Sequence, residues 1–427
     1  MATTVPRSEH PEAESADVPR LARARPWTVA TMGLARCGLY LAILTPVYSS
    51  LAIKVRSLVP EQDVVSTLAL VSSLGAVAAF LANPVFGRIS DRTTGRFGRR
   101  RPWLVVGALG MTAGLAAIAT AQSVAVVAIA WFVAQIFANA ALAAHVASIA
   151  DQVPSTQRGK VTGLMGVVQN VGILGAAYAA QLFGDRMVLF FMVPAAVGLV
   201  LTVLYAIALP DKPLVKRPPS EGGLRMVLKT FWVSPRQYPD FAWTFISRFL
   251  IMLATPMFTT FRLFYLEEDL NLTQADAVSV MATGVLVYTL ALIVAAQVAG
   301  WLSDRLRRRK AFVGLSSLVF GIGMALLVTA DSATGFYVAE VVLGIGFGVY
   351  TGVDLALVID VLPNPDDAAK DLGVFNIANA APQTMAPAVG ALLVNTGGGH
   401  NYSLLLGTAA VLCVLGALAI VPIKKVR

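Results

Sequence analysis

The chain has little charge for its length. Only 13% of its 427 residues are Asp, Glu, Lys or Arg, whereas about a quarter is usual in a soluble protein. Cysteine is scarce too, because Cys37 and Cys413 are the only two and both fall in apolar runs. They suggest neither a disulfide framework nor a metal motif. No nucleotide-binding loop, metalloprotease helix motif or nucleophile elbow is present. We therefore predict no enzymatic activity, no metal and no cofactor.

What the sequence does have is long apolar segments. Hydrophobic residues make up 57% of the chain and occur in runs of about 20, the length that crosses a bilayer as a helix. We predict an all-α membrane protein with twelve transmembrane helices. The predicted spans are 28–53, 64–86, 103–121, 123–150, 161–183, 187–209, 241–263, 276–299, 311–330, 334–359, 372–395 and 402–423.

The basic residues gather on one side of these spans. With the N-terminus inside, 27 of the 33 Lys and Arg residues fall in cytoplasmic segments, which is the asymmetry of the positive-inside rule. Lys54, Arg56, Arg186 and Arg262 are assigned outside, and Arg36 and Arg248 within spans. We expect a multi-pass protein of the cell membrane with both termini cytoplasmic. The net charge of +9 lies in short loops between apolar runs, so we predict no nucleic-acid partner.

Two arginine-rich stretches lie half a chain apart. Residues 87–103 carry six arginines and one acid, and residues 300–310 form a shorter copy. Each predicts a tight cytoplasmic turn between two membrane helices. Within them Gly87, Asp91 and Arg92 recur as Gly300, Asp304 and Arg305, at an offset of 213.

Other segments repeat at nearly the same offset. TPVYSSL (45–51) matches TPMFTTF (255–261), and Asp151 matches Asp360. Ordered matches of this kind predict two six-helix halves in parallel repeat. The predicted divisions are a cytoplasmic tail at 1–26, an N-terminal bundle at 27–210, a linker at 211–240, a C-terminal bundle at 241–423 and a tail at 424–427. Residues 224–232 of the linker predict a helix at the cytoplasmic membrane surface or a plain linker helix.

The first arginine-rich turn resembles a family signature. Its pattern G-x-x-x-D-R-x-x-x-R-x-G-R-R-R is similar to that of the major facilitator superfamily. SDRTTGRFGRRRPW and LAILTP look more specifically like the glycoside–pentoside–hexuronide and sucrose transporter branch. The resemblance implies two six-helix bundles that rock around a central cavity lined mainly by helices 1, 4, 7 and 10. It also implies a cytoplasmic latch between the bundles, with candidate residues Gly87, Asp91, Arg92, Arg99, Arg100, Asp151, Arg158, Asp304 and Arg305.

The candidate ionisable residues inside the predicted spans lie in helices 1, 4, 7 and 10. They are Arg36, His145, Arg248, Glu340 and Asp354. A charge retained at such depth normally faces water or a partner. We interpret Arg36, His145, Arg248 and Asp354 as a ring in the cytoplasmic half of the cavity, which binds solute or gates it. The alternatives are a permanent Arg248–Asp354 pair, or arginines that reach the headgroups.

Polar stripes extend this candidate site. Thr255 shares a helix face with Arg248, and Phe347 and Thr351 share one with Asp354. Polar and aromatic side chains together suit a sugar, although a hydrogen-bonded seam between helices has the same pattern. The remaining candidate cavity residues are Tyr40, Gln169, Asn170, Asn376, Asn379 and Gln383.

We predict a secondary transporter of a small polar solute, a sugar or glycoside, acting as a monomer. The proposed coupling ion is a proton, with Glu340, Asp354 and His145 as candidate carriers; a structural role for His145 stays open. Sodium is the alternative ion, but Leu68 to Phe86 contains none of the acids that sodium symporters of the branch carry. The alternative function is export of amphipathic compounds by proton exchange.

Overall fold

The computed structural model describes residues 24–184, 186–211, 213, 234–361, 368–398 and 400–424. In these ranges the chain forms helices and turns and no strand, and twelve helices are long and apolar enough to cross a membrane. The predicted fold class and number of spans are therefore confirmed. The linker helix predicted at 224–232 lies outside the described residues.

Each predicted span corresponds to one long helix or to helices joined end to end. The first six are α1 (Pro26–Thr45) continued by η1 (Pro46–Ser50) and α2 (Leu51–Arg56), α3 (Glu61–Asp91), α4 (Arg101–Thr120), α5 (Val124–Gln152), α6 (Ser155–Phe183) and α7 (Met187–Ala208). The last six are α9 (Pro239–Phe264) continued by η2 (Tyr265–Asp269), α10 (Gln274–Leu306), α11 (Arg309–Val328), α12 (Ala333–Val361), α13 (Ala368–Val394) and α14 (Tyr402–Ile420). We call α1–α7 the N-terminal half and α9–α14 the C-terminal half.

The helices extend further into the arginine-rich turns than the apolar runs predict. Helix α3 continues through Asp91 and α4 starts at Arg101, so the first turn is only Arg92–Arg100. Helix α10 continues through Leu306, and a left-handed residue, Arg307, ends it. Polar residues outside the hydrocarbon region can still continue a helix, because their helix propensity is sufficient. Hydropathy therefore underestimates helix length at this end.

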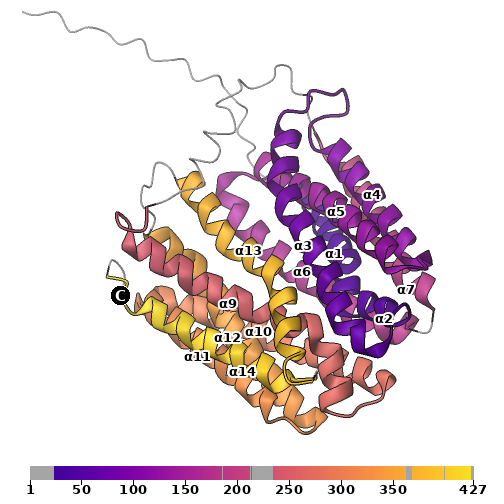
Figure 1. Cartoon of the computed structure of the whole chain (residues 1–427). Helices are drawn as coiled ribbons and strands as arrows, with labels where there is room; N and C mark the ends of the chain where they lie inside the picture. Colours follow the sequence, from indigo (N-terminus) through magenta and orange to yellow (C-terminus); the bar gives the residue numbers. More distant parts are fainter. Residues whose placement is uncertain are drawn as a thin grey trace, which may run out of the picture.

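Both halves use one packing scheme. In the N-terminal half, α1 packs on α6 and α7, α5 packs on α3 and α4, and α4 packs on α7. The C-terminal half repeats these contacts: α9 packs on α13 and α14, α12 packs on α10 and α11, and α11 packs on α14. Glycines allow some of these close contacts, because there is no room for a side chain. A Cβ added to Gly107 would lie 2.7 Å from the carbonyl oxygen of Phe137, and a Cβ added to Gly348 would lie 2.4 Å from the carbonyl oxygen of Leu292. Between the halves α3 packs on α13, and α6 on α10 (Figure 1).

The two ends of the bundle differ in how the halves meet. We call the end with the arginine-rich turns the basic end, and the opposite end, where α2 and η2 lie, the far end. One hydrophobic core cluster runs through both halves and includes the far-end residues Leu51, Leu68, Leu266 and Val394. Nearer the basic end, each half has a core cluster of its own. The halves therefore share a continuous apolar core at the far end.

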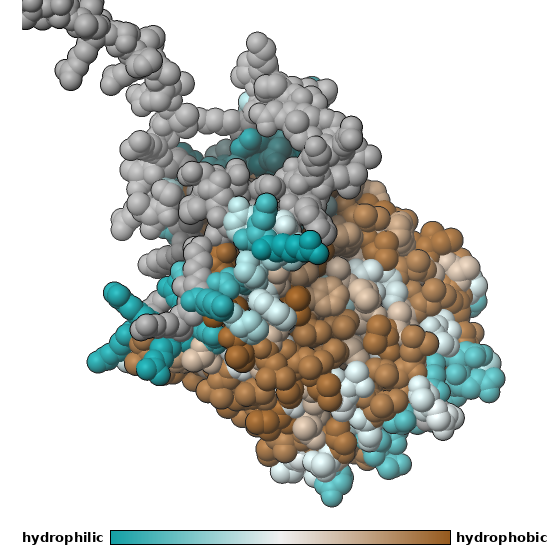
Figure 2. Space-filling view, turned by 60° about the vertical axis from the view of Figure 1, so that its left-hand side comes forward, coloured by the Kyte–Doolittle hydropathy of each residue, from teal (hydrophilic) through white to brown (hydrophobic). Residues whose placement is uncertain are grey.

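The surface matches a membrane-spanning protein. On the face seen in Figure 2, apolar side chains cover the middle and hydrophilic ones gather toward both ends. Large apolar side chains such as Leu182, Ile207 and Leu392 are about 70% exposed. In water so many exposed apolar residues would drive aggregation, whereas acyl chains solvate them.

Candidate functional site

Arg36 on α1 is held by neutral groups. Its Nη2 donates to Oε1 of Gln169 on α6 at 2.8 Å, and its guanidinium lies 5.1 Å from the ring centroid of Tyr40. The side-chain Nε is buried without a partner. Three predicted cavity residues, Arg36, Tyr40 and Gln169, therefore lie together, but no described carboxylate forms an ion pair with this arginine.

Arg248 on α9 is held by an acid. Its Nη1 donates to Oδ2 of Asp354 on α12, and its guanidinium lies 4.9 Å from the ring of Phe375 on α13. The side chain of Asp354 is 6% exposed and that of Arg248 is 20% exposed. Arg248 thus faces its partner helix and does not extend to the headgroups, so one of the alternatives left by the sequence does not apply to it.

The pairing matters because charge is costly at this depth. Arg36 lies ten residues after Pro26 and Arg248 nine after Pro239, so both sit roughly 15 Å along their helices from the basic end. Insertion scales give about 2.5–3.5 kcal/mol for an arginine at the centre of a span. The ion pair with Asp354 offsets this cost for Arg248. For Arg36 the cost is offset by the hydrogen bond to Gln169 and the contact with the Tyr40 ring, without a negative charge.

A second buried ion pair lies near the far end. Arg262 Nε on α9 is 3.4 Å from Oε1 of Glu340 on α12. Both side chains are buried, Glu340 completely, and neither the Arg262 Nε nor the Glu340 oxygens form a hydrogen bond with a described residue. Arg262 was assigned to the outside although it falls within the predicted span 241–263. That assignment was wrong, because α9 carries this arginine buried inside the protein.

The two ion pairs form two rungs between α9 and α12. Arg248 and Arg262 are fourteen residues apart, and so are Glu340 and Asp354. Fourteen residues make almost four helical turns, so each pair of like residues returns to one helix face, about 21 Å apart. Since α9 and α12 run in opposite directions, the two arginines meet the two acids in reverse order.

Tyrosines surround the far rung. Tyr48 on η1 and Tyr288 on α10 lie within electrostatic range of both Arg262 and Glu340. Tyr48 belongs to the N-terminal half, whereas the rung belongs to the C-terminal half. The far rung therefore lies where the two halves meet.

His145 lies inside the N-terminal half. It is fully buried, its Nε2 is 2.9 Å from the Met32 carbonyl oxygen, and its ring packs 5.6 Å from that of Tyr205 on α7. Because a carbonyl only accepts, Nε2 carries the hydrogen, and Nδ1 has no partner among the described residues. This arrangement suits a neutral, structural imidazole, which was the alternative to a cavity role.

The other predicted cavity residues differ in exposure. Phe347 packs between Phe320 and Tyr350, and Thr255 donates to the Ile251 carbonyl oxygen one turn earlier. Thr351 and Gln383 are exposed, whereas Asn170 and Asn379 are partly buried. The side chain of Asn376 lies outside the described set.

The first arginine-rich turn forms ion pairs with its own half. Arg99 Nη2 is 2.5 Å from Asp151 Oδ1, and Arg100 is 2.8 Å from Asp151 Oδ2 and 2.6 Å from Asp91 Oδ1. Burial opposes the charge of Arg100, but hydrogen bonds and the charges of Asp151 and Asp91 outweigh it and raise the pKa of its guanidinium. In this conformation Asp151 binds arginines of the same half.

The repeat preserves this contact. Arg309 Nη1 is 2.7 Å from Asp360 Oδ2, and both residues follow Arg100 and Asp151 by 209 positions. Of the other predicted latch residues, Gly87 lies within α3 with open space around it, Arg92 caps that helix, and Arg305 lies 5.4 Å from the Trp301 ring. The side chains of Arg158 and Asp304 lie outside the described set.

At the far end an ion pair joins the two halves. Arg56 Nη1 on α2 is 2.5 Å from Glu267 Oε2 on η2, and the Arg56 guanidinium lies 4.9 Å from the Phe264 ring. Sequence reasoning placed Arg56 on an outer loop and did not identify its partner. Both Glu267 and Tyr48 lie on π-helical segments, which often occur at functional positions.

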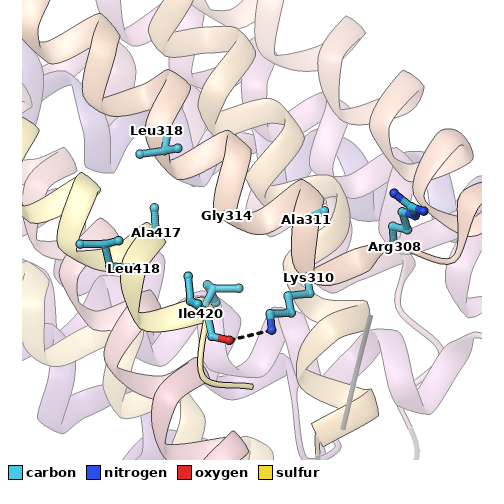
Figure 3. A pocket seen from close by; sticks show the side chains of 9 residues that line it. Arg308, Lys310, Ala311, Gly314, Leu318, Ala417, Leu418 and Ile420 are labelled. Atoms are coloured by element: carbon cyan, nitrogen blue, oxygen red, sulfur yellow. Dashed lines mark hydrogen bonds between the residues drawn. The ribbon is translucent and has the colours of Figure 1, made fainter. Parts of the chain in front are cut away.

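A pocket of about 480 Å³ opens at the surface between α11 and α14. It is lined mainly by apolar residues, including Leu318 and Leu418, with Arg308 and Lys310 at its basic end (Figure 3). Lys310 Nζ donates to the carbonyl oxygens of Val421 and Ile423 at 2.7 Å each, so it fixes the end of α14. The pocket lies away from both ion-pair rungs.

Comparison with known proteins places the chain in a family. It matches the Major Facilitator Superfamily over residues 63–288 and 275–426. An uncharacterised MFS-type transporter, YfiU of Bacillus subtilis (strain 168), is 28% identical over 143 residues, which are 33% of this chain and 27% of that protein. The match therefore spans only about a quarter of the relative's length.

Solved structures share the fold. A point mutant of the nucleoside transporter NupG aligns with a TM-score of 0.73 at 14% identity, over 93% of this chain and 99% of its own. A D-xylose–proton symporter aligns with a TM-score of 0.69 at 17% identity, over 92% and 96% of the two chains. The peptide transporter POT aligns with a TM-score of 0.70 at 14% identity, over 93% of each chain. The family match covers most of the sequence, and the chain belongs to the Major Facilitator Superfamily.

Proposed function

We propose that this protein is a secondary active transporter, which moves a small polar solute across the membrane by alternating access. The observation that carries this proposal is that, among the described residues, the halves share one continuous apolar core toward the far end, while nearer the basic end each half has its own core. Such a molecule is closed at the far end. Rocking the halves about their contact would open that end and close the other.

The solute binds between α1 and α9 at the depth of Arg36 and Arg248. On the N-terminal side Arg36, Gln169 and Asn170 supply hydrogen-bonding groups, and on the C-terminal side Thr351 and the Arg248–Asp354 pair do so. Phe347 and Phe375 add aromatic faces next to these polar groups. Hydroxyls need polar partners and sugar C–H faces need rings, which supports a sugar or glycoside as solute.

A proton is the proposed coupling ion, moving in the same direction as the solute. Glu340 is the proposed carrier, because it is fully buried and its oxygens lack hydrogen bonds with described residues. The positive charge of Arg262 stabilises the ionised carboxylate of Glu340. The other polar groups near this carboxylate are the hydroxyls of Tyr48, Tyr265 and Tyr288. Asp354 is the second candidate. His145 is set aside, since its ring already binds a backbone carbonyl within one half.

The test is uptake into proteoliposomes from a panel of labelled sugars and glycosides, with and without an inward proton gradient. We expect accumulation of at least one solute, which a protonophore reduces to equilibration. Asp63→Asn is the matched control for Asp354→Asn, since Asp63 is an exposed acid near the start of α3. Accumulation that is unchanged when the proton gradient is collapsed would exclude proton coupling. No uptake of any solute in the panel would exclude the transport of sugars or glycosides.

A further inference from the structure

The pocket between α11 and α14 opens on the membrane-facing surface of the C-terminal half (Figure 3). Its volume of about 480 Å³ falls in the range of small-molecule sites, about 300–1,000 Å³. At its rim Leu418 and Val421 are 57% and 64% exposed. Apolar side chains with this exposure face acyl chains in a membrane protein. The pocket therefore opens toward lipid.

The pocket changes character along its length. Arg308 and Lys310 lie at its basic end, and Gly314 and Leu318 extend it along α11. Leu318 follows Lys310 by eight residues, which is about 12 Å of helix. The apolar part thus reaches well into the hydrocarbon layer. A ligand that fills the whole pocket must have a long apolar segment and an anionic end.

The repeat shows what distinguishes the arginine of this pocket. In the N-terminal half Asp151 pairs with two successive arginines, Arg99 at 2.5 Å and Arg100 at 2.8 Å. The corresponding acid of the C-terminal half, 209 positions later, pairs with Arg309. Arg308, the counterpart of Arg99, is exposed and forms no ion pair with any acid that the structure describes. Its guanidinium is therefore available to an anion from outside the chain.

The repeat also shows how the pocket arises. Ala311 and Gly314, which line it, occupy the positions of Pro102 and Val105 in the N-terminal half. A Cβ added to Gly314 would lie 4.0 Å from the nearest atom, Cγ2 of Ile420. The small residues leave a gap between α11 and α14 that the larger side chains of the other half would fill in part.

Lys310 has a structural role and also a spare donor. Its Nζ donates to the carbonyl oxygens of Val421 and Ile423, and its counterpart Arg101 donates to the Leu209 carbonyl oxygen at 3.0 Å. An ammonium group has three N–H donors, so one is left without an acceptor in the described ranges. Both halves thus fix the end of a helix in this way, whereas the unpaired arginine and the gap belong to the C-terminal half.

We propose that this pocket binds an anionic phospholipid from the leaflet at the basic end. One acyl chain lies along Gly314 and Leu318, and the phosphate contacts Arg308 and the spare donor of Lys310. Basic pockets between membrane helices bind anionic headgroups, whereas a zwitterionic headgroup brings a cation of its own next to the two basic side chains. Binding here is independent of the transported solute and the coupling ion, so either proposal can fail alone.

The test is native mass spectrometry of the purified, delipidated protein with two lipids. Dioleoyl phosphatidylglycerol and dioleoyl phosphatidylcholine share both acyl chains and differ in headgroup charge. We expect phosphatidylglycerol to bind about tenfold more tightly, because its phosphate meets two cations without a competing one. Inorganic phosphate, measured by its effect on phosphatidylglycerol binding, separates a lipid site from a site for a free anion.

Two variants connect that preference to the pocket. Arg308→Gln removes the unpaired cation and should reduce the preference to less than about twofold. Its control is Arg307→Asn, which removes an exposed arginine outside the pocket at φ 52°, a left-handed conformation that Asn tolerates. Gly314→Leu fills the pocket and should weaken phosphatidylglycerol binding about tenfold, because the acyl chain is no longer buried. Its control is Gly407→Leu, which adds the same side chain to α14 where no atom lies within 4 Å.

The unfolding temperature of each lipid-free variant should match that of the parent, so that a loss of binding cannot be attributed to misfolding. Equal affinity for the two lipids would overturn the proposal, as would a preference that Arg308→Gln or Gly314→Leu leaves unchanged. Displacement of phosphatidylglycerol by millimolar inorganic phosphate would identify a free-anion site and would also overturn it. A dimer that Gly314→Leu abolishes would show that a second copy of the chain, and not a lipid, occupies the pocket.

Discussion

The two halves share a packing scheme and differ in where they place charge. At an offset of 209, Gly75 corresponds to Gly284, Trp131 to Glu340, and His145 to Asp354. A Cβ on Gly75 would clash with the Trp131 indole at 2.1 Å, and one on Gly284 would lie 3.4 Å from Glu340 Cγ. The same two positions therefore hold neutral rings in one half and acids in the other.

The N-terminal half forms the same packing scheme without acids at these two positions. In the N-terminal half Trp131 and His145 fill their positions by packing and by a hydrogen bond to Met32, without an ion pair among the described residues. Replacing a buried ion pair by apolar residues of similar volume is often neutral or stabilising. The charges of the C-terminal half are thus better explained by function than by folding.

Breaking the rung near the basic end should have the largest effect. Asp354→Asn and Arg248→Gln each leave one buried group without its partner, and we expect each to abolish solute accumulation in proteoliposomes. Both should remain folded, because the corresponding positions in the other half are neutral or lack an acidic partner. Normal accumulation by both variants would mean that this rung is structural, and Asp63→Asn controls for the loss of an acid elsewhere.

Breaking the far rung should leave some downhill uptake but abolish proton-driven accumulation, and it should destabilise the protein. Glu340→Gln leaves Arg262 buried without a counter-charge, and removing one partner of a buried pair costs about 3–5 kcal/mol. The double variant Arg262→Gln/Glu340→Gln should unfold at a higher temperature than either single variant, because no uncompensated charge remains. Additive losses in the double variant would show that the two residues act separately.

Removing the ion pair between the halves should have a smaller effect. Arg56→Gln eliminates the contact with Glu267, in which the two side chains are 22% and 9% exposed. The apolar core that the halves share at this end remains. We therefore expect the far end to open about fivefold more often, which corresponds to about 1 kcal/mol. The measurement is the rate of thiol labelling of Tyr48→Cys in a background without Cys37 and Cys413.

The control for that experiment is Arg186→Gln, which removes an exposed arginine at the same end of the molecule. It should leave the labelling rate unchanged. Equal labelling in Arg56→Gln and in the parent protein would show that the ion pair does not hold the far end closed.

The smallest effect is expected in the N-terminal half. His145→Gln keeps an N–H donor for the Met32 carbonyl, so uptake should stay within about twofold of the parent and a proton gradient should still drive it. Loss of coupling at an unchanged unfolding temperature would contradict the structural role and restore His145 as a proton carrier.

The architecture was predictable because hydropathy and repetition act over the whole chain. Runs of about 20 apolar residues identified all twelve spans, and the arginine-rich turns identified the family. Helix ends at the turns were less predictable, because Gly87 to Asp91 continue α3 beyond the hydrocarbon. Hydropathy detects the membrane boundary, which is not where the backbone stops being helical.

Individual side-chain partners were harder to predict. Arg262 was missed although a signal was available: the polar stripe Arg248, Met252, Thr255, Thr259 continues at the same spacing to position 262. Its partner Glu340 is likewise fourteen residues from Asp354. For His145 no sequence signal existed, since the direction in which a lone imidazole points depends on how α1, α5 and α7 pack.

Because both rungs connect helices of the same half, a rigid rotation between halves would leave their lengths unchanged. In the proposed cycle, the hydration of these carboxylates would alternate as Tyr48, which lies near Arg262 and Glu340, moves over the far rung or away from it. Infrared difference spectra between the two states should therefore show carboxylate bands shifting in frequency, with isotope exchange at Glu340 rising when the far end opens. The two ion pairs would keep their geometry within the C-terminal half. The position of the N-terminal half would determine which of the two pairs is exposed to water.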